Sequence, residues 1–410
     1  MRVIEARKLR AGTDPDASLP RPGMIGYRPG SKGETSMASA AVAVASRDNP
    51  ITLGWIINQK DDLIWFIGSV VASYAFLAAN LLLLRLGLSV MIITWIWALG
   101  FDGPHVFGTI SRTYADSEER RKRAKLYYGT LSLFLLGPAM VLAGHWKLFG
   151  SEAWGPAFFF FASLWAYYHL VKQHYGFMIL YKKKNNDLLE IDNLIDRAFI
   201  LLGMTYPFVR FLTHSYAAKE RLEGMRLSPQ SESIWWFETL VFSAFVISLV
   251  LFAGRQAQRI YLKQPINLPK LLLLAAALPM HWIVLRLLEP VQPAAAGALA
   301  AVATLTIYHN IQYHRIIWFH NRNKYTRETS KKYGAASVIS KSVWSYIGFA
   351  LVFGALYHIP HYTIVKPDSF WMAFIWGGAF THYYLDSKIW RVRRDAQLNE
   401  NLRMAGAEVA

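Results

Sequence analysis

The sequence predicts an all-α membrane protein, a polytopic transmembrane bundle of about ten helices. Three observations predict this class. Of the 410 residues, 54% are hydrophobic and only 17% are charged, which departs from the composition of soluble domains. Apolar runs of about twenty residues recur from residue 60 onward, each long enough to cross a hydrocarbon core of roughly 30 Å. The net charge of +17 is concentrated between these runs.

The first fifty residues precede the apolar runs and are rich in Pro, Gly, Ser and Ala. They lack the apolar core of a signal peptide, so we expect a disordered tail over residues 1–50. A single transmembrane domain is expected over residues 60–390. Its predicted spans are 62–84, 88–110, 126–145, 155–181, 193–213, 233–254, 270–288, 294–319, 342–360 and 369–390.

Basic residues follow every even-numbered span, whereas the odd-numbered exits carry almost none, apart from the loop 214–232. Under the positive-inside rule, this alternation places both termini in the cytoplasm, with residues 391–410 as a basic cytoplasmic tail. We expect the protein in a bacterial inner membrane. The charge is spread over several loops and not gathered into one basic patch, so nucleic acid is not an expected partner. The basic stretches are Arg112–Lys125, Lys182–Lys184, Arg255–Lys270, Arg322–Lys341 and Lys388–Arg394.

The chain contains no cysteine, which excludes disulfides, thiolate metal sites, iron–sulfur clusters and cysteine nucleophiles. Metal or covalent chemistry therefore requires His, carboxylate, Ser, Lys or Tyr side chains.

Histidines gather at one expected depth. Seven of the twelve lie toward the cytoplasmic ends of even-numbered spans, where ionisable residues are costly and usually face the bundle interior. One of the seven, His320, is expected just outside the membrane. His281, midway along the seventh span, is ambiguous and receives no role. The six candidate metal ligands are His105, His169, His174, His309, His314 and His382.

Two aspartates accompany these histidines at helical spacing. Asp102 precedes His105 by three residues, and Asp386 follows His382 by four, so each pair shares a helix face. Imidazole with carboxylate is the ligand set of non-haem iron, manganese or zinc, and a neighbouring carboxylate also fixes an imidazole tautomer. Asp102 and Asp386 are therefore the candidate carboxylates of the site.

Two histidine pairs have a spacing that needs explanation. His169 and His174 are five residues apart, as are His309 and His314, which separates the rings by about 140° on a regular α-helix. Either one histidine of each pair binds the metal, or each helix carries a π-bulge that aligns the two.

The segment Gln173-His174-Tyr175-Gly176 resembles the Glu-His-Tyr-Gly box of the alkane monooxygenases, with Gln in place of Glu. Together with the histidines near one end of the helices, this makes the chain similar to the integral-membrane di-iron enzymes, which include fatty-acid desaturases and fatty-acid and sterol hydroxylases. The His-x-x-x-His and His-x-x-His-His boxes of those families are absent from the sequence.

The resemblance implies non-haem iron held by the six histidines, with Asp102 and Asp386 as bridging or neighbouring carboxylates; this set of residues could hold two irons or one metal. It also implies oxygen activation and attack on a C–H bond of a lipid or hydrocarbon-like substrate that arrives from the bilayer. An electron-donor protein would dock at the cytoplasmic side, near Lys172, Arg315 and the basic loops, although positive-inside topology accounts for most of these charges.

Other function classes use the same residues differently. A zinc-dependent membrane lipid hydrolase needs only three histidines and an aspartate around a metal-bound water. A b-type haem protein would use paired histidines, such as His169 with His309, as axial ligands. A carrier would line a path across the bilayer with ionisable residues. Asp192 and Asp196, at the start of the fifth span, are expected to pair with Arg197 and the helix N-terminus.

Overall fold

The computed structural model describes residues 50–224, 228, 231–325, 330–363 and 369–404. The expected N-terminal tail lies outside this range except for Pro50. The described residues form helices, apart from loops and two short strands, β1 (Ile51–Thr52) and β2 (Ile266–Asn267), which pair in parallel. The all-α prediction is confirmed.

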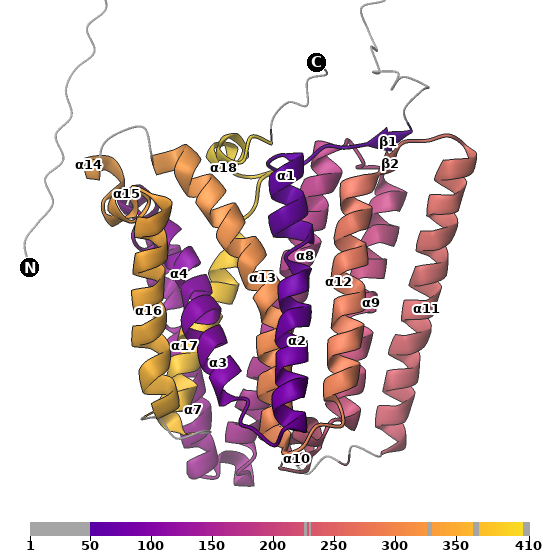
Figure 1. Ribbon diagram of the computed structural model, residues 1–410. Coiled ribbons are helices and arrows are strands. Elements are labelled where there is room, and N and C mark those ends of the chain that lie inside the picture. The colour runs from indigo at the N-terminus through magenta and orange to yellow at the C-terminus, as the bar shows by residue number, and fades with distance from the viewer. Residues whose placement is uncertain (1–49, 225–227, 229–230, 326–329, 364–368, 405–410) are drawn as a thin grey trace, which may run out of the picture. The chain divides into compact units, whose positions relative to one another are not determined.

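The long helices of the described residues run side by side (Figure 1). They are α2 (Val70–Arg85), α7 (Leu133–His145), α8 (Trp154–Lys184), α9 (Glu190–His214), α11 (Glu232–Tyr261), α12 (Leu268–Leu288), α13 (Ala294–Tyr325), α16 (Val343–Thr363) and α17 (Phe370–Ile389).

Shorter elements connect or extend them. The α-helical ones are α1 (Gln59–Asp61), α3 (Met91–Trp97), α4 (Gly103–Arg112), α5 (Ser117–Lys122), α6 (Ala124–Thr130), α10 (Tyr216–Gly224), α14 (Ser330–Tyr333), α15 (Ala335–Ile339) and α18 (Ala396–Asn401). Two π-helical turns, η1 (Asp62–Ile67) and η2 (Ala98–Asp102), and one 3-10 turn, η3 (Leu148–Gly150), complete the set.

Six helical segments of the described chain are long and apolar enough to cross a membrane: Gln59–Arg85, Ala124–His145, Glu232–Tyr261, Leu268–Leu288, Ala294–Tyr325 and Val343–His361. The other four predicted spans also coincide with helical segments, namely α3 to α4, α8, α9 and α17. Three of these four carry predicted metal ligands, and such polar residues make a helix less apolar. The count of ten spans stays a prediction.

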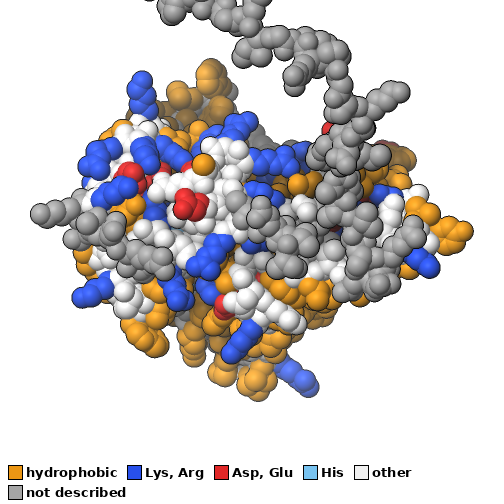
Figure 2. Space-filling model, turned by 90° about the horizontal axis from the view of Figure 1, so that it is seen from above, with side chains coloured by type: hydrophobic (Ala, Val, Ile, Leu, Met, Phe, Trp, Pro, Cys, Tyr) orange, Lys and Arg blue, Asp and Glu red, His pale blue; other side chains and the backbone are white. Residues whose placement is uncertain are grey.

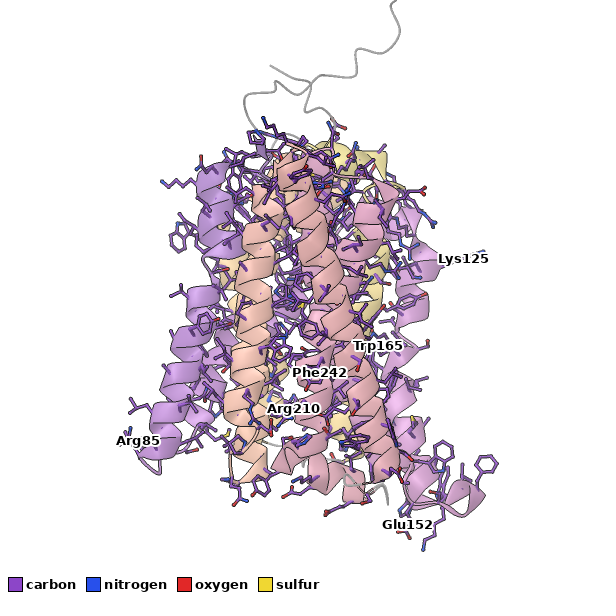
Figure 3. The ribbon with its side chains drawn as sticks, turned by 90° about the vertical axis from the view of Figure 1, so that its right-hand side faces the viewer. Arg85, Lys125, Glu152, Trp165, Arg210 and Phe242 are labelled. Atoms are coloured by element: carbon purple, nitrogen blue, oxygen red, sulfur yellow. The ribbon has the colours of Figure 1, made fainter. Side chains whose placement is uncertain are left out.

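The outer surface of the helices is apolar at mid-height. On α11, the side chains of Leu240, Val250 and Leu251 are 68%, 63% and 54% exposed. An apolar face of this extent suits contact with lipid chains. In Figure 3 the labelled aromatic side chains of Trp165 and Phe242 lie between Lys125, on the side of one end of the bundle, and Arg85, Arg210 and Glu152, toward the other end.

One end of the bundle is basic. Seen from the side of α14, α15 and α18, many Lys and Arg side chains surround a smaller number of acidic ones (Figure 2). These helices follow the eighth and tenth predicted spans, whose exits the sequence marks as basic. We call this end the basic face; its cations include Lys122, Lys183, Lys332, Arg391 and Arg403.

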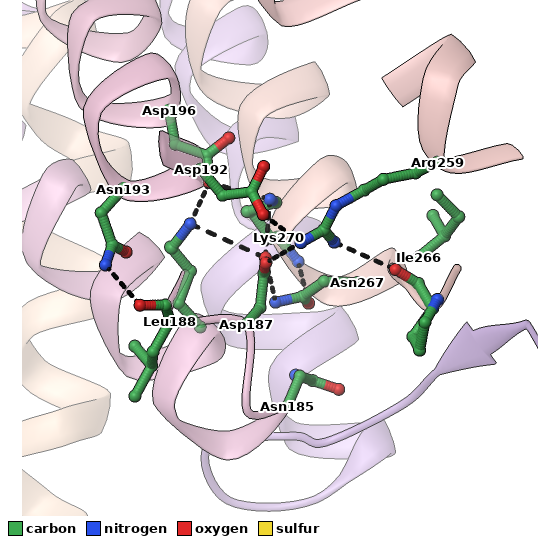
Figure 4. A network of polar contacts seen from close by, with 12 residues as sticks. Asn185, Asp187, Leu188, Asp192, Asn193, Asp196, Arg259, Ile266, Asn267 and Lys270 are labelled. Carbon is green, nitrogen blue, oxygen red and sulfur yellow. Dashed lines mark hydrogen bonds and ion pairs between the residues drawn. The ribbon is translucent and has the colours of Figure 1, made fainter. Parts of the chain in front are cut away.

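A buried set of ion pairs ties four segments together near this face (Figure 4). Lys270 Nζ lies 2.7 Å from Asp187 Oδ2 and 2.9 Å from Asp196 Oδ2, and Arg259 lies 2.5 Å from Asp192 Oδ2. Asp192 and Asp196 thus pair with residues of α8, α11 and α12, whereas the sequence analysis expected Arg197 as their partner. We call the set the ion network: Lys182, Asp187, Asp192, Asp196, Arg255, Arg259 and Lys270.

Residues 391–404 of the predicted C-terminal tail pack onto the bundle through α18. Leu398 and Leu402 are at most 1% exposed, and Asn323 Nδ2 on α13 donates to the Asn401 carbonyl. Residues 405–410 lie outside the described range.

Close contact between α4 and α16 positions α4, the helix that carries His105. A Cβ on Gly103 would lie 2.4 Å from Gly354 Cα, so only glycine permits this approach. Small residues allow membrane helices to pack this closely. The π-helical turn η2 leads directly into α4 and so precedes His105 by three residues.

Candidate metal centre

Four histidines from four helices meet inside the bundle. His105 is the third residue of α4, His169 and His309 lie midway along α8 and α13, and His382 lies in the second half of α17. Each is at most 8% exposed. We call His105, His169, His309 and His382 the four-histidine cluster.

The ring nitrogens of the cluster converge. His105 Nε2 lies 2.8 Å from His382 Nε2 and 3.1 Å from His309 Nε2. One ligand atom from each of His105, His169 and His382 lies within 4.8 Å of the others. Two nitrogens bound at right or tetrahedral angles to an ion about 2.0–2.1 Å away are themselves about 2.8–3.4 Å apart. The two short contacts therefore have the spacing of neighbouring ligands on one ion.

A hydrogen-bond chain fixes the tautomer of His382. Thr109 Oγ1 donates to Asp386 Oδ1 at 2.7 Å, and Tyr313 Oη donates to the same oxygen at 2.7 Å, because an ionised carboxylate only accepts. The Thr109 oxygen, 2.7 Å from His382 Nδ1, is then left to accept the proton of that nitrogen. His382 Nε2 consequently presents a lone pair toward His105.

Hydrogen bonds between neutral rings do not satisfy this arrangement. A neutral imidazole nitrogen either donates or accepts. If His105 Nε2 carries a proton and donates it to His382 Nε2, it has no lone pair with which to accept from His309. If His105 Nε2 instead accepts a proton from His309, the lone pairs of His105 Nε2 and His382 Nε2 face each other with no proton between them. A cation bound by the lone pairs of His105 and His382, with His169 beside them, removes this conflict, because no proton is then needed between the nitrogens.

Aromatic rings enclose the cluster. The Tyr313 ring centre lies 4.4 Å from that of His105, and Tyr383 stacks on His169 with centres 4.5 Å apart and planes at 24°. His169 Nε2 is buried and has no hydrogen-bond partner among the described residues. The enclosure excludes solvent and leaves this nitrogen available to an ion.

The other two predicted histidine ligands lie at the edge of the cluster. The His314 ring centre is 6.4 Å from that of His105, and its Nδ1 lies 2.9 Å from Tyr346 Oη. The His174 ring centre is 6.3 Å from that of His309. Because α8 and α13 are regular α-helices at these positions, neither carries the π-bulge of the second predicted alternative, and one histidine of each five-apart pair enters the cluster.

The two predicted carboxylates have different surroundings. Asp386 accepts from Thr109 and Tyr313 and so acts on the cluster through His382. Asp102, at the end of η2, has its Oδ2 3.2 Å from His358 Nε2 on α16, and its side chain is 26% exposed. Nothing in the spacing of Asp102 predicts this partner.

In α8 and α13, the cluster lies farther from the end of the helix than the sequence predicts. His105 and His382 precede the last residues of α4 and α17, Arg112 and Ile389, by seven positions each. His169 precedes the end of α8 by fifteen residues, or about 22 Å at 1.5 Å per residue. The extra length of α8 and α13 carries their ends beyond those of α4 and α17.

Sequence reasoning assigned no role to Thr109 and Tyr313. The signal that identifies them is their spacing: each follows a cluster histidine by four residues, as Asp386 follows His382. Residues four apart share a helix face. Gln173 follows His169 in the same way, and its Nε2 donates to the His309 carbonyl at 2.8 Å.

No family model matches this chain, and neither a curated protein nor a solved structure is detectably similar to it. The functional argument therefore rests on the geometry of the site.

Proposed function

We propose that this chain is an integral-membrane, metal-dependent oxidoreductase that uses non-haem iron to act on a lipid or hydrocarbon-like substrate. The observation that carries the proposal is the buried group of His105, His169 and His382, whose ligand atoms all lie within 4.8 Å of one another, with His309 Nε2 3.1 Å from His105 Nε2. Imidazole is a common ligand of iron, copper and zinc.

The spacing of the nitrogens favours a single bound ion over haem. Two axial histidines on opposite sides of a haem iron hold their nitrogens about 4 Å apart, twice a typical metal–nitrogen bond. The contacts of 2.8 and 3.1 Å are shorter than this. A zinc hydrolase would need a general base beside a metal-bound water, whereas Asp386 is engaged in orienting His382.

The residues of the site have separate tasks in this proposal. His105, His169, His309 and His382 hold the ion, while Thr109 and Asp386 keep the His382 Nε2 lone pair directed at it. Tyr313 and Tyr383 exclude water, which suits reactive chemistry on an apolar substrate. Bound iron would supply the activation of dioxygen for attack on a C–H bond.

The apolar surroundings support a lipid-like substrate. A groove of about 320 Å³ opens beside α17, the helix that carries His382. Its mixture of a cation, hydroxyl groups and apolar side chains suits an amphipathic molecule. The lining residues are Lys125, Leu126, Gly129, Thr130, Ser132, Leu133 and Tyr384.

A chain of rings supports an electron-donor protein as the partner. From His105 it passes through Tyr313, Trp390, His320 and Tyr325 to Tyr333, with successive ring centres 4.4, 6.0, 6.1, 6.3 and 5.2 Å apart. Tyr333 lies at the basic face, where Lys332 Nζ is 5.1 Å from its ring centre. An acidic one-electron carrier would be attracted to this face, which the proposal places in the cytoplasm of a bacterium.

Elemental analysis and a visible spectrum of the detergent-purified protein test the proposal. We expect iron without a Soret band, and dioxygen consumption on addition of a reductant and candidate lipids. His309→Ala should lose most of the metal while still inserting into the membrane, because it removes one of the converging nitrogens. His145→Ala is the matched control, since His145 is exposed at the end of α7.

Other results would overturn the proposal in distinct ways. A Soret band would make the same histidines axial ligands. Zinc as the only bound metal would favour the membrane lipid hydrolase. A wild-type protein without metal would favour a carrier in which the histidines bind protons or substrate. Equal metal content in wild type, His309→Ala and His145→Ala would refute the site itself.

A further inference from the structure

A second pair of histidines lies next to the four-histidine cluster. His174 on α8 and His281 on α12 are both fully buried, with ring centres 5.7 Å apart and planes at 89°. From the sequence alone, His281 is ambiguous and receives no role. The fold brings it to one of the predicted metal ligands.

The tautomer of His174 is fixed by the backbone. Its Nδ1 lies 3.0 Å from the Leu170 carbonyl oxygen, which only accepts hydrogen bonds. The proton is therefore on Nδ1, and Nε2 carries a lone pair. That Nε2 is buried, and no described residue provides it with a hydrogen bond.

The tautomer of His281 is fixed by a two-step chain. Tyr167 Oη donates to the Met204 carbonyl at 2.6 Å, so its oxygen is left to accept from His281 Nδ1 at 2.7 Å. His281 Nε2 therefore also carries a lone pair. It too is buried, and the part of the chain that the structure describes offers it no donor.

Two neighbouring acceptors without a donor are unfavourable in a protein interior. An unsatisfied buried polar group is destabilising, so such groups usually meet an ion, a water or a ligand. A metal-binding histidine usually donates its other ring N–H to a neighbouring group, which directs the free lone pair at the metal. His174 and His281 each have such a hydrogen bond at Nδ1.

We propose that His174 and His281 bind a second metal ion through their Nε2 atoms, next to the ion of the four-histidine cluster. This inference rests on the proposed function and makes the centre dinuclear. His309 neighbours both positions: its ring centre lies 4.6 Å from that of His105 and 6.3 Å from that of His174, and its Nδ1 is buried and unpartnered among the described side chains. Two protein ligands leave coordination positions open for water, dioxygen or substrate, whereas a closed structural site fills its positions with protein ligands.

Counting metal ions per chain tests the inference. The full-length protein in detergent is loaded with ferrous iron without oxygen, freed of excess ion and analysed for iron and protein. We expect two ions in the wild type, one in His281→Ala and two in His145→Ala. His105→Ala should lose the ion of the four-histidine cluster.

A milder variant protects the test against misfolding. Tyr167→Phe removes only the hydroxyl that holds His281 Nδ1, so the second ion should bind 10- to 100-fold more weakly in a ferrous iron titration, with the first unchanged. Phe208→Leu is the control, because it removes the ring stacked on Tyr167 but no hydrogen bond.

The outcomes separate this inference from the proposed function. One ion in the wild type, lost in His309→Ala but retained in His281→Ala and unaffected by Tyr167→Phe, would leave the proposed function intact and refute the second position. In that case a water donating to both nitrogens fills the space. No iron in any variant would refute both.

Discussion

The bundle buries two polar clusters, the ion network and the four-histidine cluster, which differ in whether their members satisfy one another. In the ion network every charged side chain has an opposite charge within 4 Å, and Arg259 Nε is its one buried polar atom without a hydrogen-bond partner among the described residues. In the four-histidine cluster the nitrogens converge on one another, and His105 Nδ1, His169 Nε2 and His309 Nδ1 find no partner among the described residues.

This difference separates structural from functional burial. A buried charge is tolerated when a partner and hydrogen bonds replace its hydration, so a closed network needs nothing from outside the chain. Buried nitrogens that face one another without protons to share require an added group. Substitutions in the ion network should therefore lower the free energy of unfolding without altering metal binding. Substitutions of residues that hydrogen-bond the cluster histidines should weaken metal binding without altering the free energy of unfolding.

The largest effect is expected from breaking the ion network. Lys270→Ala removes the ammonium group that lies between Asp187 and Asp196, leaving buried carboxylates short of a partner. Removing one partner of a buried pair costs about 3–5 kcal/mol. We expect this loss in the free energy of unfolding in detergent, with the iron content of the folded fraction unchanged.

A surface pair provides the control for this variant. Lys122 pairs with Glu118 at 3.1 Å, but its side chain is 52% exposed. Lys122→Ala should change the free energy of unfolding by about 0–1 kcal/mol. Iron lost from the folded Lys270→Ala protein would contradict the division between the two clusters.

A smaller effect, on metal affinity, is expected from Thr109→Val. The substitution removes the oxygen that accepts from His382 Nδ1, so the tautomer that directs Nε2 into the cluster is no longer held. Loss of such a supporting group typically weakens metal binding 10- to 100-fold. Chelator competition against the purified protein measures the change.

Thr94→Val is the matched control for that substitution. Thr94 is 1% exposed and belongs to the same predicted span, but its hydroxyl bonds only to the Val90 carbonyl, at 3.1 Å. If both valine variants bound metal equally well, Thr109 would have no supporting role.

The sequence predicted the helical architecture because apolar length is a local property. All ten expected spans coincide with helical segments, since a run of about twenty apolar residues needs no knowledge of its neighbours. Four of the six predicted histidines lie together in the interior, where ionisable residues on apolar helices are expected, and their role as metal ligands stays a prediction.

The sequence could not predict which residues of other helices a side chain contacts, because the packing of the helices determines these partners. Asp196 is four residues from Asp192 and next to Arg197, yet its partners Lys182 and Lys270 come from α8 and α12. His281 stands alone on α12, and only the packing of that helix against α8 brings it to His174. Local spacing identifies a helix face but not the face that it meets.

The smallest effect is expected from acid, and it acts on the ion network. Asp187 lies in the connection between α8 and α9. Burial raises the pKa of its carboxyl group, but the nearby cations, Lys270 first, outweigh this and hold the pKa below its ordinary value. A lowered pKa in the folded state adds stability that is complete above the unfolded pKa, about 3.9 for aspartate, and is lost as the pH falls through the folded pKa. The thermal midpoint of the wild type should therefore fall more steeply below about pH 4 than that of Asp187→Asn. The variant should have a lower midpoint at pH 7, because it lacks this charge. Parallel curves of midpoint against pH for the two proteins would show that the Asp187 charge adds no stability.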